Sequence, residues 1–235
     1  MWVKQAISWF LVFMILFSSA SLLREPAGST EDWENPYIDV TQDLWSYQYI
    51  TELNKAGVLP SSEKFQGQEE ETRGNLVLYL YNMDQGVFKD RKKSRDKKKE
   101  KAAPNFTDVT KDSPYYDAVC WAKEQGIISG YKNADGSYTH FGPHENVTRE
   151  QLACMFARYA SINDGLDTWS DCTAMNEKVG ADQVSGYAHD SMGWAVDTGL
   201  IEGVSGNELR PQNSAWRASM AELVRRYSRL YLDSL

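Results

Sequence analysis

The sequence of 235 residues is long enough for one or two domains with a hydrophobic core. Its 42% hydrophobic and 25% charged residues are those of an ordinary globular protein, and the formal net charge is −8. The three cysteines exclude a disulfide-rich scaffold, and no Cys-x-x-Cys metal motif occurs.

The N-terminus is typical of a secretory signal peptide. Lys4 supplies a positive charge, residues 6–17 are mostly apolar, and Ser18-Ser19-Ala20 offers small residues for cleavage. The apolar run is shorter than the ~20 residues of a membrane-spanning helix, which favours a cleaved signal peptide; an uncleaved signal anchor is the alternative. We expect a signal peptide at 1–20, a flexible segment at 21–34, and no other contact with a membrane.

One series of signals then occurs three times. In each copy a helical pattern ends at a glycine, a branched apolar pair and a turn follow, and an arginine opens a second helical pattern. The glycines and arginines are Gly57, Gly126 and Gly199, and Arg73, Arg149 and Arg217. Asp39 and Asp108 each precede their glycine by 18 residues (57 − 39, 126 − 108), whereas Asp171 precedes Gly199 by 28 (199 − 171). About ten extra residues therefore lie near 172–180 in the third copy.

We place the repeats at residues 35–84, 105–161 and 162–235. The segment between the first two, 85–104, contains a run from Lys89 to Lys101 with nine basic and three acidic residues, a net charge of +6. So dense a block of charge predicts a solvated linker. The alternative is an accessory contact with a polyanion, and nucleic acid is not an expected partner of a secreted protein.

Both helices of each repeat show an apolar face. The first helix, predicted at Leu44–Ala56 in the first copy, has apolar residues four and seven positions before the glycine, which places them on one helix face. The glycine itself suits the left-handed backbone conformation at a helix end. The second helices carry apolar residues at i, i+3, i+4 and i+7: Leu76, Tyr79, Leu80 and Met83; Leu152, Met155, Phe156 and Tyr159; Met220, Leu223, Val224 and Tyr227. One helix pair cannot bury such a stripe, so we expect the three stripes to share one bundle.

The arginines at the start of the second helices are the candidate binding residues. Thr148 and Gln151 form a predicted capping box, which places Arg149 in the first turn of its helix. A guanidinium offers a planar set of donors, and a helix N-terminus adds backbone N–H groups, so together they predict an anion site. The alternative is an internal ion pair with Asp39, Asp108, Asp171 or an acid of another repeat.

Catalytic chemistry has little support. The histidines are His140, His144 and His189, and no nucleophile, zinc or phosphate-binding motif surrounds them. We expect no enzyme, no cofactor and no metal. Cys120 and Cys154 fall on the two helices of the middle repeat, so a disulfide between them stays open as an alternative to free thiols.

The middle copy resembles the repeat of the S-layer homology (SLH) family. The resemblance rests on Asn105-Phe106-Thr107-Asp108-Val109, Gly126-Ile127-Ile128-Ser129-Gly130, Phe141-Gly142-Pro143 and Thr148-Arg149-Glu150-Gln151. It implies a mostly α fold in which three pseudo-symmetric helix-loop-helix repeats surround a central helical bundle. It also implies a non-catalytic protein of a bacterial cell wall or S-layer that binds secondary cell-wall polysaccharide, often carrying ketal-linked pyruvate, in grooves between repeats.

Carried over by motif, the implied binding residues are Arg149, Asp108, Trp121, Gly126 and Gly130; Arg73, Asp39, Trp45 and Gly57; and Arg217, Asp171, Trp194, Gly199 and Gly203. The copies depart from the family pattern. The acid of the Thr-Arg-Ala-Glu motif is missing in all three, and the first copy has Ser61 in place of its second glycine and no proline after Phe65. Arg149 is therefore the favoured site, and a protein–protein interaction module that has lost sugar binding is the alternative.

Overall fold

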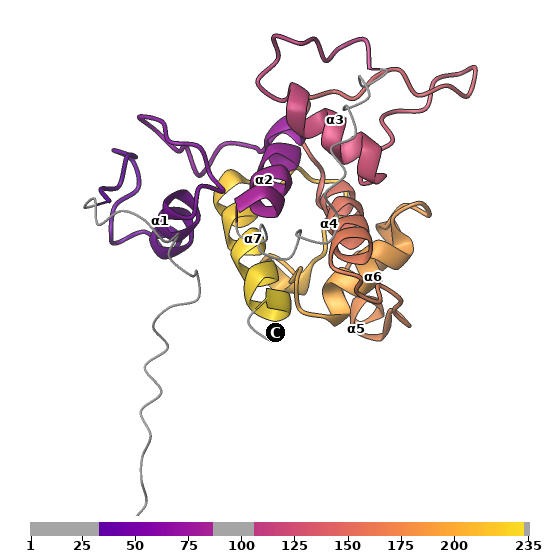
Figure 1. The fold of residues 1–235 in the computed structure, drawn as a ribbon. Helices are drawn as coiled ribbons and strands as arrows, with labels where there is room; N and C mark the ends of the chain where they lie inside the picture. The colour runs from indigo at the N-terminus through magenta and orange to yellow at the C-terminus, as the bar shows by residue number, and fades with distance from the viewer. Residues whose placement is uncertain (1–32, 87–105, 233–235) are drawn as a thin grey trace, which may run out of the picture.

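The computed structural model describes residues 33–86 and 106–232 (Figure 1). The predicted signal peptide and nearly all of the basic linker lie outside these residues. The described chain is mostly helical and has no strands, only isolated β-bridges. Its α-helices are α1 (Tyr47–Lys55), α2 (Arg73–Gly86), α3 (Tyr116–Gln125), α4 (Arg149–Asn163), α5 (Thr173–Asn176), α6 (His189–Asp197) and α7 (Arg217–Leu232).

These helices form the three predicted pairs, α1/α2, α3/α4 and α6/α7. The first pair begins later than predicted, because residues 41–46 form turns and α1 starts only at Tyr47. The extra residues of the third copy form the short helix α5 and a 3₁₀ turn at Ala181–Gln183. Thr148 caps α4 in a complete capping box with Gln151, as expected.

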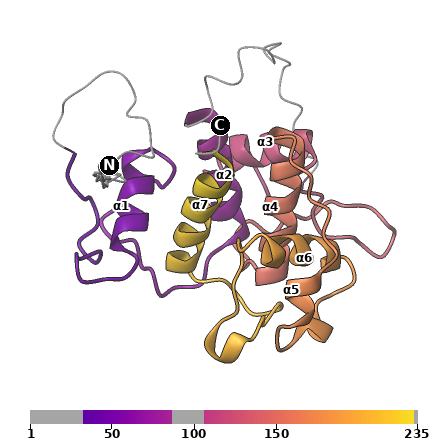
Figure 2. The same ribbon diagram turned by 90° about the horizontal axis from the view of Figure 1, so that it is seen from below.

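The second helices of the pairs, α2, α4 and α7, form the centre of the molecule, and α1, α3 and α6 lie outside them (Figures 1 and 2). We call these the inner and the outer helices. All twelve residues of the three apolar stripes are buried, and they belong to one continuous hydrophobic cluster. Tyr227 of α7 packs on Phe156 and Tyr159 of α4, with ring centroids 5.5 and 5.7 Å apart. The expectation of one shared bundle is confirmed.

Each outer helix packs on the inner helix of another repeat. α3 lies against α2, α6 lies against α4, and α1 closes the circle against α7. Each of these three helix–helix contacts therefore joins two different repeats.

A ring of three backbone hydrogen bonds joins the repeats where the inner helices begin. Val147 N–H donates to Glu71 O (2.8 Å), Ala215 N–H to Val147 O (2.9 Å), and Glu71 N–H to Ala215 O (2.7 Å). Each ring residue stands two positions before a motif arginine. The ring therefore fixes the start of all three inner helices relative to one another.

The glycines and cysteines have structural roles. Gly57, Gly126 and Gly199 have φ angles of 75°, 79° and 73°, which confirms the predicted left-handed residue at the end of each outer helix. All three cysteines are buried free thiols, so Cys120 and Cys154 are not bridged. Cys154 Sγ instead faces the Tyr187 carbonyl at 4.0 Å.

Candidate functional site

The helix N-termini are already occupied by protein, so the expectation that their amides bind an anion is wrong. In all three copies the first amide of the inner helix donates to the turn that precedes the inner helix of the next repeat: Arg73 to Glu145 O (2.9 Å), Arg149 to Asn213 O (3.0 Å) and Arg217 to Glu69 O (3.0 Å). The second amide does the same: Gly74 to Pro143 O (2.9 Å), Glu150 to Pro211 O (2.9 Å) and Ala218 to Gly67 O (3.0 Å). The four orphan amides of a helix start need partners, and a neighbouring repeat supplies them for the first two amides here.

The arginine side chains cross to the same neighbouring turns. Each donates to the carbonyl of the apolar turn residue: Arg73 Nε to Phe141 O (2.9 Å), Arg149 Nε to Leu209 O (2.8 Å) and Arg217 Nη1 to Phe65 O (3.1 Å). We call each such contact, with the groove beside it, a seam. Every motif arginine thus helps to join two repeats, whatever else it binds.

The predicted aspartates hold the turns from the other side. Asp39 accepts from Phe65 N–H (2.7 Å) and Gln66 N–H (2.8 Å). Asp108 accepts from Phe141 N–H (3.0 Å) and Gly142 N–H (2.6 Å). Burial by itself would raise the pKa of Asp108, but these bonds outweigh it and lower the pKa.

The third repeat lacks this carboxylate. Asp171 is exposed and accepts from Thr173 N–H at 3.1 Å, away from the turn. Leu209 N–H donates instead to the Val179 carbonyl at 2.9 Å. The inserted residues therefore replace a carboxylate by a backbone acceptor.

The seam of Arg73 is filled. The guanidinium carbon lies 4.5 Å from the ring centroid of Tyr131 and 4.9 Å from that of Phe141, and Nη1 donates to Gln151 Oε1 at 3.1 Å. Arg73 is only 5% exposed. Its burial lowers its pKa, against the opposing effect of Tyr131 and Glu145 nearby.

The seam of Arg217 contains an internal acid. Arg217 Nε lies 3.6 Å from Glu71 Oε1, and Glu71 is fully buried. The carboxylate also accepts from Thr72 N–H (2.9 Å), Asn75 Nδ2 (2.6 Å) and Tyr79 Oη (3.1 Å). Here the alternative of an ion pair with an acid of another repeat is realised.

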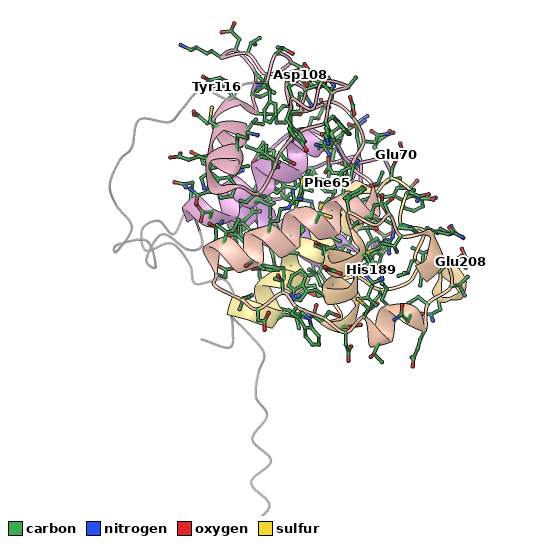
Figure 3. All side chains as sticks on the ribbon, turned by 90° about the vertical axis from the view of Figure 1, so that its right-hand side faces the viewer. Phe65, Glu70, Asp108, Tyr116, His189 and Glu208 are labelled. Carbon is green, nitrogen blue, oxygen red and sulfur yellow. The ribbon has the colours of Figure 1, made fainter. Side chains whose placement is uncertain are left out.

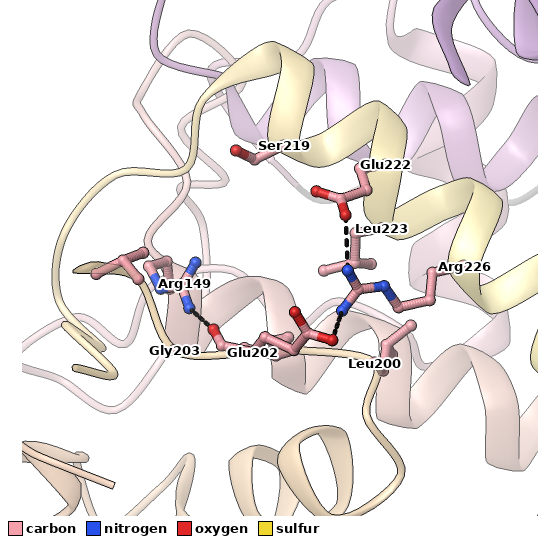
Figure 4. Close-up of a pocket in the computed structure, with 10 residues that line it drawn as sticks. Arg149, Leu200, Glu202, Gly203, Ser219, Glu222, Leu223 and Arg226 are labelled. Carbon is pink, nitrogen blue, oxygen red and sulfur yellow. Dashed lines mark hydrogen bonds and ion pairs between the residues drawn. The ribbon is translucent and has the colours of Figure 1, made fainter. Parts of the chain in front are cut away.

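The seam of Arg149 opens into a pocket of about 150 Å³ (Figure 4). Arg149 forms one side, the chain after α6 forms the floor, and α7 forms the far side. The lining residues are Arg149, Leu200, Ile201, Glu202, Gly203, Val204, Ser219, Glu222, Leu223 and Arg226. Arg149 donates Nη2 to Glu202 O at 2.7 Å, and no carboxylate among the described residues lies within ion-pair distance of it.

The charges in this pocket are unevenly paired. Burial and the nearby Arg210 both lower the pKa of Arg149, so no acid compensates its charge. Arg226 on α7 has two carboxylate partners, Glu222 Oε1 (2.6 Å) and Glu202 Oε1 (3.1 Å). Between them, Leu200 and Leu223 are apolar and buried. The pocket therefore offers an anion one guanidinium that no carboxylate within the described residues pairs.

The structure separates the other predicted site residues. Trp121 is 6% exposed and packs between Tyr81 and Tyr159, and Trp194 is 2% exposed, so both are core side chains. Trp45, in the turn before α1, is 59% exposed. A Cβ on Gly130 would lie 2.5 Å from Phe106, so that glycine permits close packing, whereas Gly203 lines the pocket.

Sequence reasoning missed Arg226, although the repeat contains a signal for it. The residue nine positions after each motif arginine donates to a carbonyl at the end of its own outer helix: Asn82 to Val58 O (3.0 Å), Arg158 to Ile127 O (3.2 Å) and Arg226 to Gly199 O (3.1 Å). Figure 3 shows the side chains on the right-hand side of Figure 1, where Asp108, His189 and Glu208 are labelled. Aligning the second helices on their arginines would have identified this position.

The described residues contain neither a cluster suited to a metal ion nor a helix suited to span a membrane. No group of three or more His, Cys, Asp or Glu side chains is placed to hold a metal ion there. Within residues 33–86 and 106–232, no helix has the length and apolarity that crossing a bilayer requires.

Comparisons with known proteins point to one family. The family profile described as "S-layer homology domain" matches residues 105–153 and 181–221. The chain is 25% identical over 234 residues to an endoglucanase of Bacillus sp. (strain KSM-635), covering 94% of this chain and 22% of that protein. It is 29% identical over 125 residues to the surface-layer 125 kDa protein of Lysinibacillus sphaericus, covering 52% and 10%.

An amylopullulanase of Thermoanaerobacterium thermosulfurigenes is 27% identical over 134 residues, 54% of this chain and 6% of that protein. The chain thus spans less than a quarter of each of these relatives. SLH domains typically anchor proteins to the cell wall at a bacterial surface. The chain thus contains two segments that match the S-layer homology domain, and the helical repeats described above agree with that match.

Proposed function

We propose that this chain is a non-catalytic anchoring module that binds an acidic secondary cell-wall polysaccharide in the pocket at Arg149. One observation carries the proposal: Arg149 is the pocket-lining guanidinium whose bonds go to carbonyls and whose charge meets no carboxylate within the described residues. A carboxylate on a saccharide, such as a ketal-linked pyruvate, would supply the missing anion.

The shape of the pocket supports a sugar ligand. Its volume of about 150 Å³ suits part of one residue of a polymer more than a whole small molecule. Ser219 and Glu222 line the pocket beside the guanidinium and offer polar groups to the hydroxyl groups of a sugar.

The relatives support attachment as the shared role. The relatives are named as an endoglucanase, an amylopullulanase and a surface-layer protein, and each resembles this chain over only a small part of the relative's own length. A segment common to such different proteins is best explained by a task that all of them need, which is to stay at the cell surface.

Co-sedimentation with purified native cell wall tests the proposal. The unmodified chain should pellet with the wall. Arg149→Lys keeps the charge but loses the planar fork, so we expect binding to weaken about tenfold, the factor that ~1.4 kcal/mol represents. Arg149→Ala should remove binding, with circular dichroism used to verify that the variant folds.

Arg210→Ala is the matched control, because it removes a nearby positive charge that does not line the pocket. A deletion of residues 89–101 separates the pocket from plain charge attraction by the basic run, which salt would screen strongly. Binding that follows the basic run, or that persists in Arg149→Ala, would contradict the proposal. No binding by the unmodified chain would favour a protein partner instead.

A further inference from the structure

The seam of Arg73 repeats the construction of the Arg149 pocket but contains an additional aromatic ring. Tyr131 stands five residues after Gly126, and Val204 stands five residues after Gly199. Val204 lines the open pocket, whereas the Tyr131 ring lies over the Arg73 guanidinium at 4.5 Å. At this position the two seams therefore differ in whether a ring covers the motif arginine.

A second layer holds the tyrosine in place. His140 stacks on the Tyr131 ring, with centroids 5.9 Å apart and planes 28° apart, and Tyr131 N–H donates to His140 O at 2.8 Å. The imidazole is itself fixed at both nitrogens, with Nδ1 3.2 Å from Asp108 Oδ2 and Nε2 2.9 Å from Glu145 Oε1.

The filled seam gives Arg73 the kinds of contact that a bound saccharide would give. Tyr131 supplies a flat ring against the guanidinium, and Gln151 Oε1 accepts from Nη1 where the open pocket has the smaller Ser219. Glu145 and Asp108 supply negative charge nearby. Arg73 is 5% exposed as a result, so an anion has no direct access to it.

We infer that Tyr131 is a built-in occupant of the Arg73 seam, which closes a second saccharide site of the same class as the one at Arg149. This inference rests on the proposed function for the class of ligand, but the closing role of Tyr131 does not. Tyr131→Val, which installs the residue of the open pocket, opens the seam and exposes Arg73.

The closing role is tested without any polymer. The folded chain is treated with phenylglyoxal, which modifies accessible guanidinium groups, and the modified arginines are mapped by peptide mass spectrometry. Arg73 should be protected in the unmodified chain and react several-fold faster in Tyr131→Val. Tyr138→Val is the control, because this tyrosine lies in the same loop and is 41% exposed, and it should leave Arg73 protected. A reactive Arg73 in the unmodified chain, or no change in Tyr131→Val, overturns the inference.

The second site is tested by rescue of wall binding. Arg149→Ala should lose binding, and Tyr131→Val in the same chain should restore it; adding Arg73→Lys to that double variant should weaken it again. Failure of the rescue, when the unmodified chain binds and Arg149→Ala does not, refutes the second site and leaves the proposed function standing. Absence of binding by the unmodified chain refutes the proposed function and with it the saccharide site, while the modification experiment still decides whether Tyr131 closes the seam.

Discussion

Arg73 and Asp108 hold Phe141 from two sides. Asp108 accepts the Phe141 N–H at 3.0 Å, and Arg73 donates to the Phe141 carbonyl at 2.9 Å. The aspartate and the phenylalanine belong to the middle repeat and the arginine to the first. The arginine and the aspartate, for which the sequence suggested an ion pair, therefore both bind the backbone of a third residue.

Loss of the Asp108 carboxylate should destabilise the fold. Asp108→Ala leaves the amides of Phe141 and Gly142 without their charged acceptor, which we expect to cost about 1.5–3 kcal/mol of unfolding free energy. Urea denaturation measures the change. Asp171→Ala is the matched control, because this exposed carboxylate accepts from a single amide, and it should cost clearly less than Asp108→Ala. Equal effects of the two variants would contradict the prediction.

Acid should weaken the fold through the same turn. Backbone hydrogen bonds, working against burial, lower the pKa of Asp108 below 3.8, and bonds from His140 and Tyr131 lower the pKa of Glu145 below 4.5. The unfolded chain binds these protons at higher pH than the folded chain does. The stability that they confer is therefore complete above their unfolded pKa values and is lost as pH falls through the folded ones.

The measurement is the free energy of unfolding in urea at about pH 5.5 and at about pH 3. Asp108→Asn should flatten the decline between these two values, because it removes one of the titrating groups. A decline as steep in Asp108→Asn as in the unmodified chain would show that other groups cause it.

Arg217 should matter for stability more than for binding. Arg217→Met leaves the buried Glu71 carboxylate without its nearby cation, at a cost of about 3 kcal/mol. Glu71→Gln in the same chain should recover part of that loss, because the remaining donors suit a neutral amide oxygen. A double-mutant cycle in urea measures the coupling, and additive effects would exclude it. Binding to cell wall should be unchanged in folded Arg217 variants.

The three repeats should unfold together. Leu80 is fully buried in the shared cluster, so Leu80→Ala should cost about 2–5 kcal/mol. Because the core is continuous, circular dichroism and tryptophan fluorescence should report a single coincident transition, lowered as a whole in the variant. Separate transitions for the two signals would contradict a single core.

The thiols should be inert in the folded chain. Burial raises the pKa of the Cys154 and Cys172 thiols, and at Cys172 the nearby Asp197 and Asp190 raise it further. Ellman's reagent should find all three thiols unreactive in buffer and reactive in denaturant. Fast reaction of one thiol in buffer would show that its side chain is accessible.

The sequence was informative where the structural signal is local. The i, i+3, i+4, i+7 stripes and the glycines at the helix ends depend on helix geometry alone, and both are as predicted. The capping box of Thr148 is equally local. The basic run between the first two repeats lies outside the described residues, so its role stays a prediction.

Contacts between repeats were not predictable in the same way. The amides of Arg149 and Glu150 are blocked by Asn213 and Pro211, more than 60 residues away, and only closure of the circle brings them together. Similarly, an apolar face cannot tell a core tryptophan from an exposed one, because both satisfy the same spacing. Trp121 and Trp194 are both buried, and Trp121 packs on Tyr81 of the first repeat, a contact that the periodicity does not reveal.

The hydrogen-bonded ring of Glu71, Val147 and Ala215 uses only main-chain atoms. Its three residues have an acidic, a branched aliphatic and a methyl side chain, so the hydrogen bonds of the ring do not depend on the kind of side chain. Because the main chain joins the repeats at this ring, the side chains at the three seams can differ from one another. One molecule accordingly contains an open, a filled and an ion-paired version of the same contact between repeats.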